Sequence, residues 1–200
     1  MFLIGVAGGS GSGKTTFAKK VVKLVNSDQV AHLHQDSYYL PQQPKEAFIK
    51  GKANFDHPDA FDWPLLRSQL RALKEGKSIT TPTYDFVAQT RSATTEVVGP
   101  AKVWVFDGIY ALWDEEILAM MDLKIFLHVD ADIRFIRRLH RDAKERGRSL
   151  DSIINQYYDT VRPMHSQFLE PTGQFADLTV GEETDVPAEV LASQIRAVLK

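Results

Sequence analysis

An eight-residue stretch near the N-terminus constrains the fold more than any other part of the chain. Residues 8–15 read Gly-Gly-Ser-Gly-Ser-Gly-Lys-Thr and match the pattern G-x-x-x-x-G-K-[ST]. The stretch follows an apolar run, Phe2–Ala7, and opens a helical pattern over Thr15–Asn26. Glycine permits a tight turn in which backbone N–H groups and the helix start face a polyphosphate. The pattern therefore predicts a strand, a phosphate-binding loop (P-loop) and a helix in succession.

The P-loop pattern assigns an expected task to each of its polar residues. Lys14 would reach the β- and γ-phosphates of a nucleotide, and Thr15 would bind Mg²⁺. Asp107 ends the apolar run Val103–Phe106, where a carboxylate would hold Mg²⁺ through water. The expected nucleotide-binding residues of the loop are Gly8, Gly9, Ser10, Gly11, Ser12, Gly13, Lys14, Thr15 and Thr16.

Short apolar segments alternate with helical patterns along the chain. This alternation predicts an α/β fold of the P-loop NTPase type, with a five-stranded parallel sheet flanked by helices. A chain of 200 residues fits one domain, 1–200. The expected strands are Phe2–Ala7, Val30–His34, Lys102–Phe106, Leu123–Val129 and Asp177–Val180. The expected helices are Thr15–Asn26, Asp62–Gly76, Asp114–Met121, Ala131–Glu145, Leu150–Phe168 and Ala188–Leu199.

Two segments interrupt this alternation. Residues 37–58 are polar and aromatic and indicate a long functional loop. Residues 79–98 consist of two extended segments around a polar middle, which predicts a β-hairpin that protrudes from the core.

Charge is concentrated in residues 134–148, although the whole chain carries only −2. This segment holds six Arg and one Lys against one Asp and one Glu, a local charge of +5 that favours an anionic partner such as phosphate. The spacing places Arg134, Arg138 and Arg141 on one helical face. We expect a lid over residues 141–150, with Gly147 as a hinge or a helix end and with Arg141 and Arg146 stabilising transferred charge. The apolar stripe expected on the opposite face comprises Ile136, Leu139 and Ala143.

Composition excludes several other classes. A near-neutral net charge argues against a nucleic-acid binder held by bulk positive charge. The absence of Cys excludes disulfides, thiol nucleophiles and Cys-ligated metals, and it fits a reducing cytoplasm. No uncharged apolar run approaches the ~18 residues that cross a bilayer. We therefore expect a cytoplasmic protein without nucleic-acid or membrane partners.

Other residues distinguish among the classes of P-loop protein. A guanine-nucleotide switch needs Asn-Lys-x-Asp, but Asn26, Asn54 and Asn155 are not followed by Lys. A kinase needs a group beside the acceptor hydroxyl, and Asp36 follows the strand Val30–His34. Carboxyl ends of parallel strands share one sheet edge, so Asp36 can face the γ-phosphate across an acceptor and take its proton. The alternative is that Asp36 only forms a turn.

The motifs together resemble those of uridine–cytidine kinases, within the phosphoribulokinase/uridine kinase group. The resemblance covers about residues 2–180. The motifs that carry it are GGSGSGKTT (8–16), QDSYY (35–39), NFDHPDAFD (54–62), PTYDF (82–86), VFDGIYAL (105–112), RDAKERGRSLDSIINQY (141–157) and ADLTV (176–180).

The resemblance implies phosphorylation of uridine and cytidine at the 5′-hydroxyl to UMP and CMP, in pyrimidine salvage. The donor would be ATP or GTP with Mg²⁺, and the family commonly forms homotetramers, partly through the hairpin. The implied catalytic residues are Asp36, Lys14, Arg141 and Arg146, and the implied metal residues are Thr15, Asp36 and Asp107.

The resemblance also implies a nucleoside site. Phe55 would pack on the base, Asp56 would bind the ribose hydroxyls with help from Arg138, and Tyr84 would read the base edge. The implied substrate residues are Phe55, Asp56, Tyr84, Phe86, Gln89, Arg138, Arg148 and Gln156.

Three positions depart from the family pattern. Gln89 replaces a common His, Asp107 replaces a common Glu, and residues 181–185 replace a Pro-Arg-Gly segment, with Asp185 at a nucleotide-site position. The amide of Gln89 can donate or accept, so we expect uridine and cytidine to be accepted within about tenfold of each other. The alternative is that Gln89 points to solvent and Tyr84 alone reads the base.

Besides a P-loop NTPase switch, which the missing Asn-Lys-x-Asp motif disfavours, two other functions remain open at this point. One is a kinase of the same group with another acceptor, such as ribulose 5-phosphate or pantothenate, which the NFDHPDAFD and PTYDF matches disfavour. The other is a nucleotide-binding regulator without catalysis, which the intact Lys14, Thr15, Asp36 and Asp107 disfavour.

Overall fold

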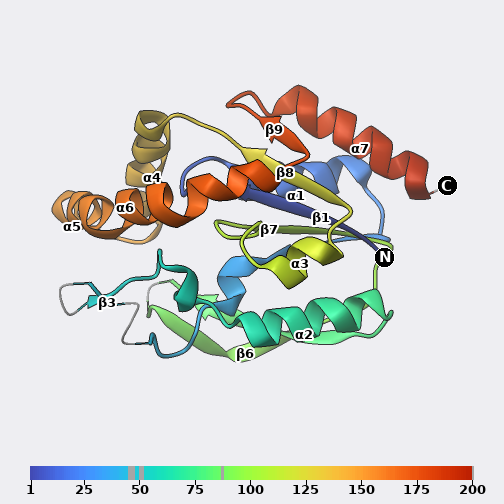
Figure 1. Cartoon of the computed structure of the whole chain (residues 1–200), viewed down its shortest axis with the longest axis horizontal. Coiled ribbons are helices and arrows are strands. Elements are labelled where there is room, and N and C mark those ends of the chain that lie inside the picture. The colour runs from blue at the N-terminus through green and yellow to red at the C-terminus, as the bar shows by residue number, and fades with distance from the viewer. Residues whose placement is uncertain (45–47, 50–51, 87, 200) are drawn as a thin grey trace.

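A five-stranded sheet forms the centre of the computed structural model, which describes residues 1–44, 48–49, 52–86 and 88–199 (Figure 1). The strand order is β2-β7-β1-β8-β9, and every pairing in this sheet is parallel. The predicted five-stranded parallel sheet is therefore confirmed. Its strands are β1 (Phe2–Gly8), β2 (Val30–His34), β7 (Val103–Gly108), β8 (Leu123–Leu127) and β9 (Leu178–Val180).

Helices cover both faces of this sheet, so two cores form (Figure 1). Ile4 and Val6 of β1 pack in the core beneath α1 (Lys14–Val25) and α7 (Asp185–Leu199). The alternate residues, Leu3 and Ala7, belong to the opposite core, which α2 (Trp63–Lys74) and α3 (Glu115–Met120) cover. Burial on both faces explains why the central strands consist of continuous apolar runs.

Side-chain caps fix the beginnings of α2 and α3. The carboxylate of Asp62 accepts a hydrogen bond from the backbone N–H of Leu65 at 3.1 Å, and that of Asp114 accepts from Ile117 at 3.1 Å. Each cap satisfies a donor that the first turn leaves free. The predicted helix starts at Asp62 and Asp114 are thereby confirmed as cap positions.

Helix α4 (Ala131–Glu145) is confirmed as a helix, and its buried face is the one that carries the arginines rather than the apolar stripe. Arg134 and Arg138 are buried, whereas Ile136 is 49% exposed and Ala143 is exposed. The inner face of α4 lies against the P-loop, where guanidinium groups find acceptors. Arg138 Nη1 donates to Ser10 Oγ at 2.8 Å, and Arg134 Nε donates to the carbonyl of Val129 at 2.9 Å.

The helix expected over Leu150–Phe168 is helical throughout but not α-helical throughout. The residues form α5 (Leu150–Gln156), η4 (Tyr157–Val161), α6 (Arg162–Met164) and η5 (His165–Leu169), and η6 (Glu170–Phe175) follows directly. Elements η4 and η5 are π-helical turns, and η6 is a 3₁₀ turn. Widened turns of this kind shift side chains relative to a regular helix and are frequent at functional sites.

Smaller elements lie outside the central sheet. Strands β5 (Ile79–Asp85) and β6 (Thr90–Val98) pair antiparallel as a hairpin within residues 79–98. The segment 37–58 contributes to η1 (Gln35–Tyr38), β3 (Phe48–Ile49), β4 (Lys52–Ala53) and η3 (Pro58–Ala60). Residues 45–47 and 50–51 of that segment lie outside the described residues.

A search of the described ranges for bilayer-crossing helices finds none with the required length and apolar character.

Candidate active site

The P-loop has the backbone geometry that its glycines predict. Gly11 and Gly13 adopt φ angles of 83° and 89°, in the left-handed region that glycine favours. A Cβ atom on Gly11 would lie 2.2 Å from the backbone oxygen of Arg134, so α4 approaches the loop too closely for a side chain. Helix α1 begins at Lys14, directly after the loop. The loop and the helix N-terminus therefore form an anion-binding end of the expected kind.

A cavity of about 990 Å³ opens beside the P-loop at the carboxyl edge of the sheet. This volume lies at the upper end of the usual range for ligand pockets. The P-loop, the end of β2, the β5–β6 hairpin and α4 all contribute to its walls. The predicted site residues that line it are Gly11, Gly13, Lys14, Thr15, Thr16, Asp36, Tyr84, Phe86, Arg141 and Arg146.

Lys14 and Asp36 bring opposite charges to this cavity. Burial lowers the pKa of Lys14, while Asp36 and Asp107 act in the opposite direction. Burial raises the pKa of Asp36, and the nearby Lys14 opposes this shift. A carboxylate whose pKa is raised is a stronger base than an exposed one. The arrangement thus suits Asp36 for accepting a proton beside a phosphate-binding lysine.

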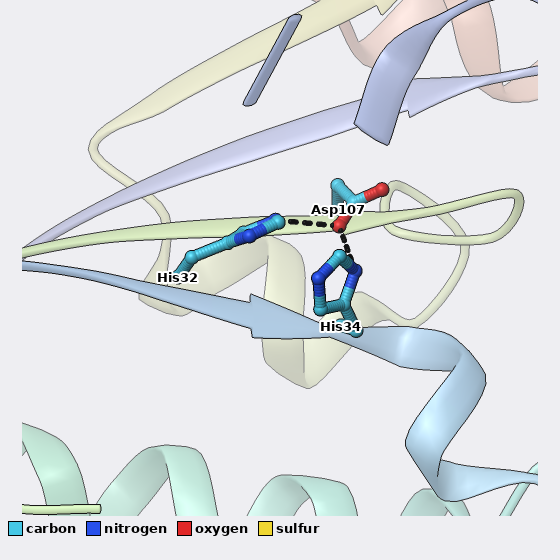
Figure 2. Close-up of side chains that lie close together, drawn as sticks. All are labelled: His32, His34 and Asp107. Carbon is cyan, nitrogen blue, oxygen red and sulfur yellow. Dashed lines mark hydrogen bonds and ion pairs between the residues drawn. The ribbon is translucent and has the colours of Figure 1, made fainter. Parts of the chain in front are cut away.

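Asp107 lies at the end of β7 among three hydrogen-bond donors (Figure 2). Thr15 Oγ1 donates to Asp107 Oδ2 at 2.5 Å. His32 Nε2 and His34 Nδ1, which point from β2 towards β7, lie 2.7 and 2.8 Å from Asp107 Oδ1. Burial by itself raises the pKa of Asp107, but the hydrogen bonds from the two histidines outweigh it and the pKa lies well below its usual value.

An ionised carboxylate next to a hydroxyl supplies the oxygen ligands that Mg²⁺ prefers. Thr15 and Asp107 therefore fit the predicted magnesium role. Sequence reasoning missed His32 and His34, although their i, i+2 spacing on one strand places both side chains on the same face of the sheet.

Asp142 organises the arginines at the end of α4. Its side chain is fully buried, and Arg141 Nη2 lies 2.8 Å from Asp142 Oδ1. Arg138, Arg146 and Arg148 each have a nitrogen 3.5 Å from one of its oxygens. Burial by itself raises the pKa of Asp142, but Arg138, Arg141 and Arg146 outweigh it and the pKa is lowered. We missed Asp142 in the sequence, where its i+4 spacing from Arg138 and i−4 spacing from Arg146 was the available signal.

Aromatic contacts connect the hairpin to the residues that directly follow α4 and η1. The guanidinium carbon of Arg146 lies 4.2 Å from the ring centroid of Phe86, and Phe86 packs edge-on against Tyr84. The ring of Tyr39 lies 5.0 Å from that of Tyr84 and 5.7 Å from that of Phe55. The structure therefore gathers the predicted base-binding residues Phe55, Tyr84 and Phe86 into one aromatic cluster beside the cavity.

The remaining predicted nucleoside residues belong to a polar network. Gln156 Oε1 accepts from Arg138 at 2.9 Å and also from Arg148. Asp56 Oδ2 accepts from Thr160 Oγ1 at 2.8 Å, within the π-helical turn η4. Thr160 was not predicted, because the irregular turn that aims its hydroxyl at Asp56 leaves no periodic signal.

A family model decides what this site belongs to. The model described as the phosphoribulokinase / uridine kinase family matches residues 3–187. The chain belongs to this family. It is therefore a kinase, and the uridine–cytidine kinase resemblance found in the motifs is confirmed at family level.

Two uridine kinases match this chain along nearly their whole length. A uridine kinase from Lactobacillus helveticus is 50% identical over 200 residues, covering 98% of this chain and 95% of the relative. A uridine kinase from Deinococcus deserti is 48% identical and covers 99% and 97%. The structure of phosphoribulokinase from Rhodobacter spheroides is 16% identical to this chain and superimposes with a TM-score of 0.67. The match covers 90% of this chain and 69% of the phosphoribulokinase chain. The two proteins therefore share the P-loop kinase fold.

Two predicted site residues lie apart from the others in this member of the family. Gln89 is exposed at the hairpin turn with a left-handed φ of 54°. Asp185 is exposed at the start of α7 and forms an ion pair with Lys20. Among the described residues, the cavity lining includes neither of them. The position of Gln89 agrees with the alternative in which its side chain points to solvent.

Proposed function

We propose that this protein transfers the γ-phosphoryl group of ATP, or of GTP, to the 5′-hydroxyl of uridine and cytidine. The observation that carries the proposal is the meeting of Lys14, Thr15 and Asp36 on one cavity of about 990 Å³. Uridine kinases of 48–50% identity over nearly the whole chain support pyrimidine nucleosides as acceptors.

The donor side of the site is the P-loop. Its N–H groups and the ammonium of Lys14 would hold the β- and γ-phosphates, and the backbone conformation at Gly11 and Gly13 leaves room for this approach. Thr15 and Asp107, with Asp36, would hold Mg²⁺. When bound, Mg²⁺ supplies positive charge that offsets the negative charge developing between the phosphates.

The acceptor side is built around Asp36. Its carboxylate would accept the proton of the 5′-hydroxyl while the oxygen forms a bond to the γ-phosphorus. The bond from that phosphorus to the bridging oxygen breaks, and ADP leaves with the electron pair. Phe55, Tyr84 and Phe86 would pack against the base. Asp56, Arg138, Arg148 and Gln156 would orient the ribose and the transferred group.

The arginine cluster provides the charge for closure. Arg141 and Arg146 line the cavity and are anchored to Asp142, so they would meet the equatorial oxygens of the transferred group when residues 141–150 close. Closure would also exclude water, which otherwise competes with the nucleoside for the phosphoryl group.

Further parts of the proposal concern the whole protein. We place it in the cytoplasm as a single kinase domain, 1–200, that forms homo-oligomers and salvages free pyrimidine nucleosides. Both uridine and cytidine would be accepted, and with Gln89 exposed the base edge would be read by Tyr84 alone.

A substrate panel tests the proposal. ADP release is measured with ATP and Mg²⁺ in the presence of uridine, cytidine, adenosine, ribulose 5-phosphate or pantothenate, and each product is identified by mass. Turnover of uridine and cytidine to their 5′-monophosphates is the expected result. Turnover of another acceptor alone would replace the substrate assignment, and nucleotide binding without any product would indicate a non-catalytic regulator.

A further inference from the structure

His32, His34 and Asp107 form a compact cluster at the carboxyl edge of the sheet (Figure 2). One ligand atom from each lies within 4.8 Å of the others. Both imidazoles lie close to the same carboxylate oxygen, at 2.7 and 2.8 Å. The two histidines come from adjacent positions on one face of β2, and their rings lie 3.8 Å apart.

This donor set is of a kind that binds transition metals. Two imidazoles and one carboxylate recur as the protein ligands of open zinc sites, which keep a fourth position for another ligand. Zn–N bonds of about 2.0–2.1 Å in a tetrahedron separate neighbouring ligand atoms by roughly 3.3 Å. Each imidazole nitrogen would need to move about half an ångström away from Asp107 Oδ1 to reach that separation.

The surroundings of the cluster favour a role in ion binding over a purely structural role for these three hydrogen-bonded side chains. His34 lines the cavity and its side chain is 35% exposed, which provides an entry path. Asp107 is 2% exposed, and the hydroxyl of Thr15 holds its second oxygen in place. A fixed carboxylate orients a metal ligand before binding.

Ligand chemistry discriminates between metals at this position. Mg²⁺ prefers an all-oxygen shell and gains nothing from imidazole, whereas imidazole suits Zn²⁺, Co²⁺ and Ni²⁺. Asp107 serves either class of ion, but His32 and His34 serve only the second.

We propose that His32, His34 and Asp107 form a binding site for a borderline divalent transition-metal ion, with Zn²⁺ as the natural occupant. An ion held there would occupy the Asp107 carboxylate, to which the proposed function assigns Mg²⁺. This competition between the two ions is the only part of the inference that rests on the proposed function. The binding itself needs neither nucleotide nor nucleoside.

Cobalt provides the direct test, because Co²⁺ takes the place of Zn²⁺ in such sites and absorbs visible light. The purified full chain is titrated with Co²⁺ alone and then with Zn²⁺, and the visible band is followed. The expected result is one Co²⁺ per chain, displaced by Zn²⁺. His32→Phe and His34→Gln should each weaken Co²⁺ binding at least tenfold.

His140→Gln is the matched control, because His140 is exposed on α4 outside the cluster. It should bind Co²⁺ as the unsubstituted chain does, and the melting temperatures of all variants identify any that fail to fold. Absence of a visible band in the unsubstituted protein overturns the proposal. Equal binding by His34→Gln and His140→Gln also overturns it. Because no turnover is measured, a failed metal site and a failed kinase assignment are distinguishable.

Discussion

At the scale of single residues, the burial of Asp36 lowers the stability of the fold but makes its carboxylate a stronger base. Burial raises the pKa of its carboxyl group, so the ionised form is disfavoured where the fold holds it. A base whose pKa is raised takes a hydroxyl proton more readily than an exposed aspartate does. The same shift means that the negative charge at neutral pH opposes folding.

Asp36→Asn separates these two effects. We expect kcat to fall by ~10²–10⁴ because general-base assistance is lost. The melting temperature should stay the same or rise, because a buried charge is removed. Steady-state kinetics and calorimetry measure both. Asp28→Asn is the control, since Asp28 is exposed just before the opposite end of β2. Near-normal turnover in Asp36→Asn would remove Asp36 from the catalytic role.

His165 makes stability depend on pH. Burial and the neighbouring Arg134, whose Nη2 lies 3.2 Å from His165 Nε2, lower the pKa of this histidine to about 4. In the unfolded chain its pKa is near 6.5. Between about pH 6.5 and 4, His165 is therefore protonated in the unfolded state but neutral in the folded state. The folded state therefore loses stability as the pH falls through this window.

His165→Gln should remove that part of the pH dependence. We expect the free energy of unfolding to decline less between pH 6.5 and 4, by about 1–3 kcal/mol, in urea titrations at several pH values. His140→Gln should show the original decline. An unchanged slope in His165→Gln would mean that His165 takes up protons equally in both states.

At the scale of elements, α4 has arginines on its buried face and an isoleucine in solvent. The periodicity of residues 131–145 predicted the helix correctly, because spacing is a local property. Periodicity did not indicate which face is buried, because the partners of Arg134 and Arg138 are Val129, His165, Gln156 and a P-loop serine up to 128 positions away. Distant pairing of this kind leaves no mark on hydrophobic periodicity.

Asp142→Asn tests whether one carboxylate holds the end of α4 together. Removing the charge leaves four arginines facing one another around a buried site, and breaking such a buried pair costs about 3–5 kcal/mol. We expect a loss of that size in the free energy of unfolding, measured with urea. Glu182→Gln is the matched control, because Glu182 also pairs with an arginine of α4 but is half-exposed. Its Oε1 lies 2.6 Å from Arg137 Nη2. It should cost less than about 1 kcal/mol.

One result for Asp142→Asn would contradict this prediction. A loss similar to that of Glu182→Gln would show that water or salt replaces the carboxylate, and that the arginines are held by their other contacts. In that case Arg138 would depend on Ser10 and Gln156 alone.

At the scale of the whole molecule, the sequence predicted the central sheet and the edge that carries the site better than the positions of individual side chains. Apolar runs and a glycine loop predicted the central sheet, and the shared edge of parallel strands predicted that Lys14 and Asp36 would meet. Gln89 and Asp185 lie apart from the cavity, because turn conformation and helix position decide where those side chains go. His32 and His34 became visible only when the β2–β7 register placed His34 opposite Asp107.

A ligand that binds only the folded chain should raise its melting temperature. At a hundred times its dissociation constant, ATP adds about 2.7 kcal/mol, which corresponds to roughly 5–11 °C for a chain of this size. Thermal scans with and without ATP and Mg²⁺ measure this shift. Lys14→Ala should lose most of it, whereas Lys23→Ala, exposed on the same helix, should keep it. A full shift in Lys14→Ala would place nucleotide binding elsewhere.

The position of β7 between β1 and β2 also governs how the chain is made. The first hundred residues contain β1 and β2, which do not pair with each other but with the strand at 103–108. A growing polypeptide that has emerged from the ribosome only as far as residue 100 therefore contains β1 and β2 without the strand that pairs with both. Such unpaired edges invite association with other chains. Synthesis must pass residue 108 before Thr15 can reach Asp107, so no truncated product that ends earlier can assemble the phosphate site.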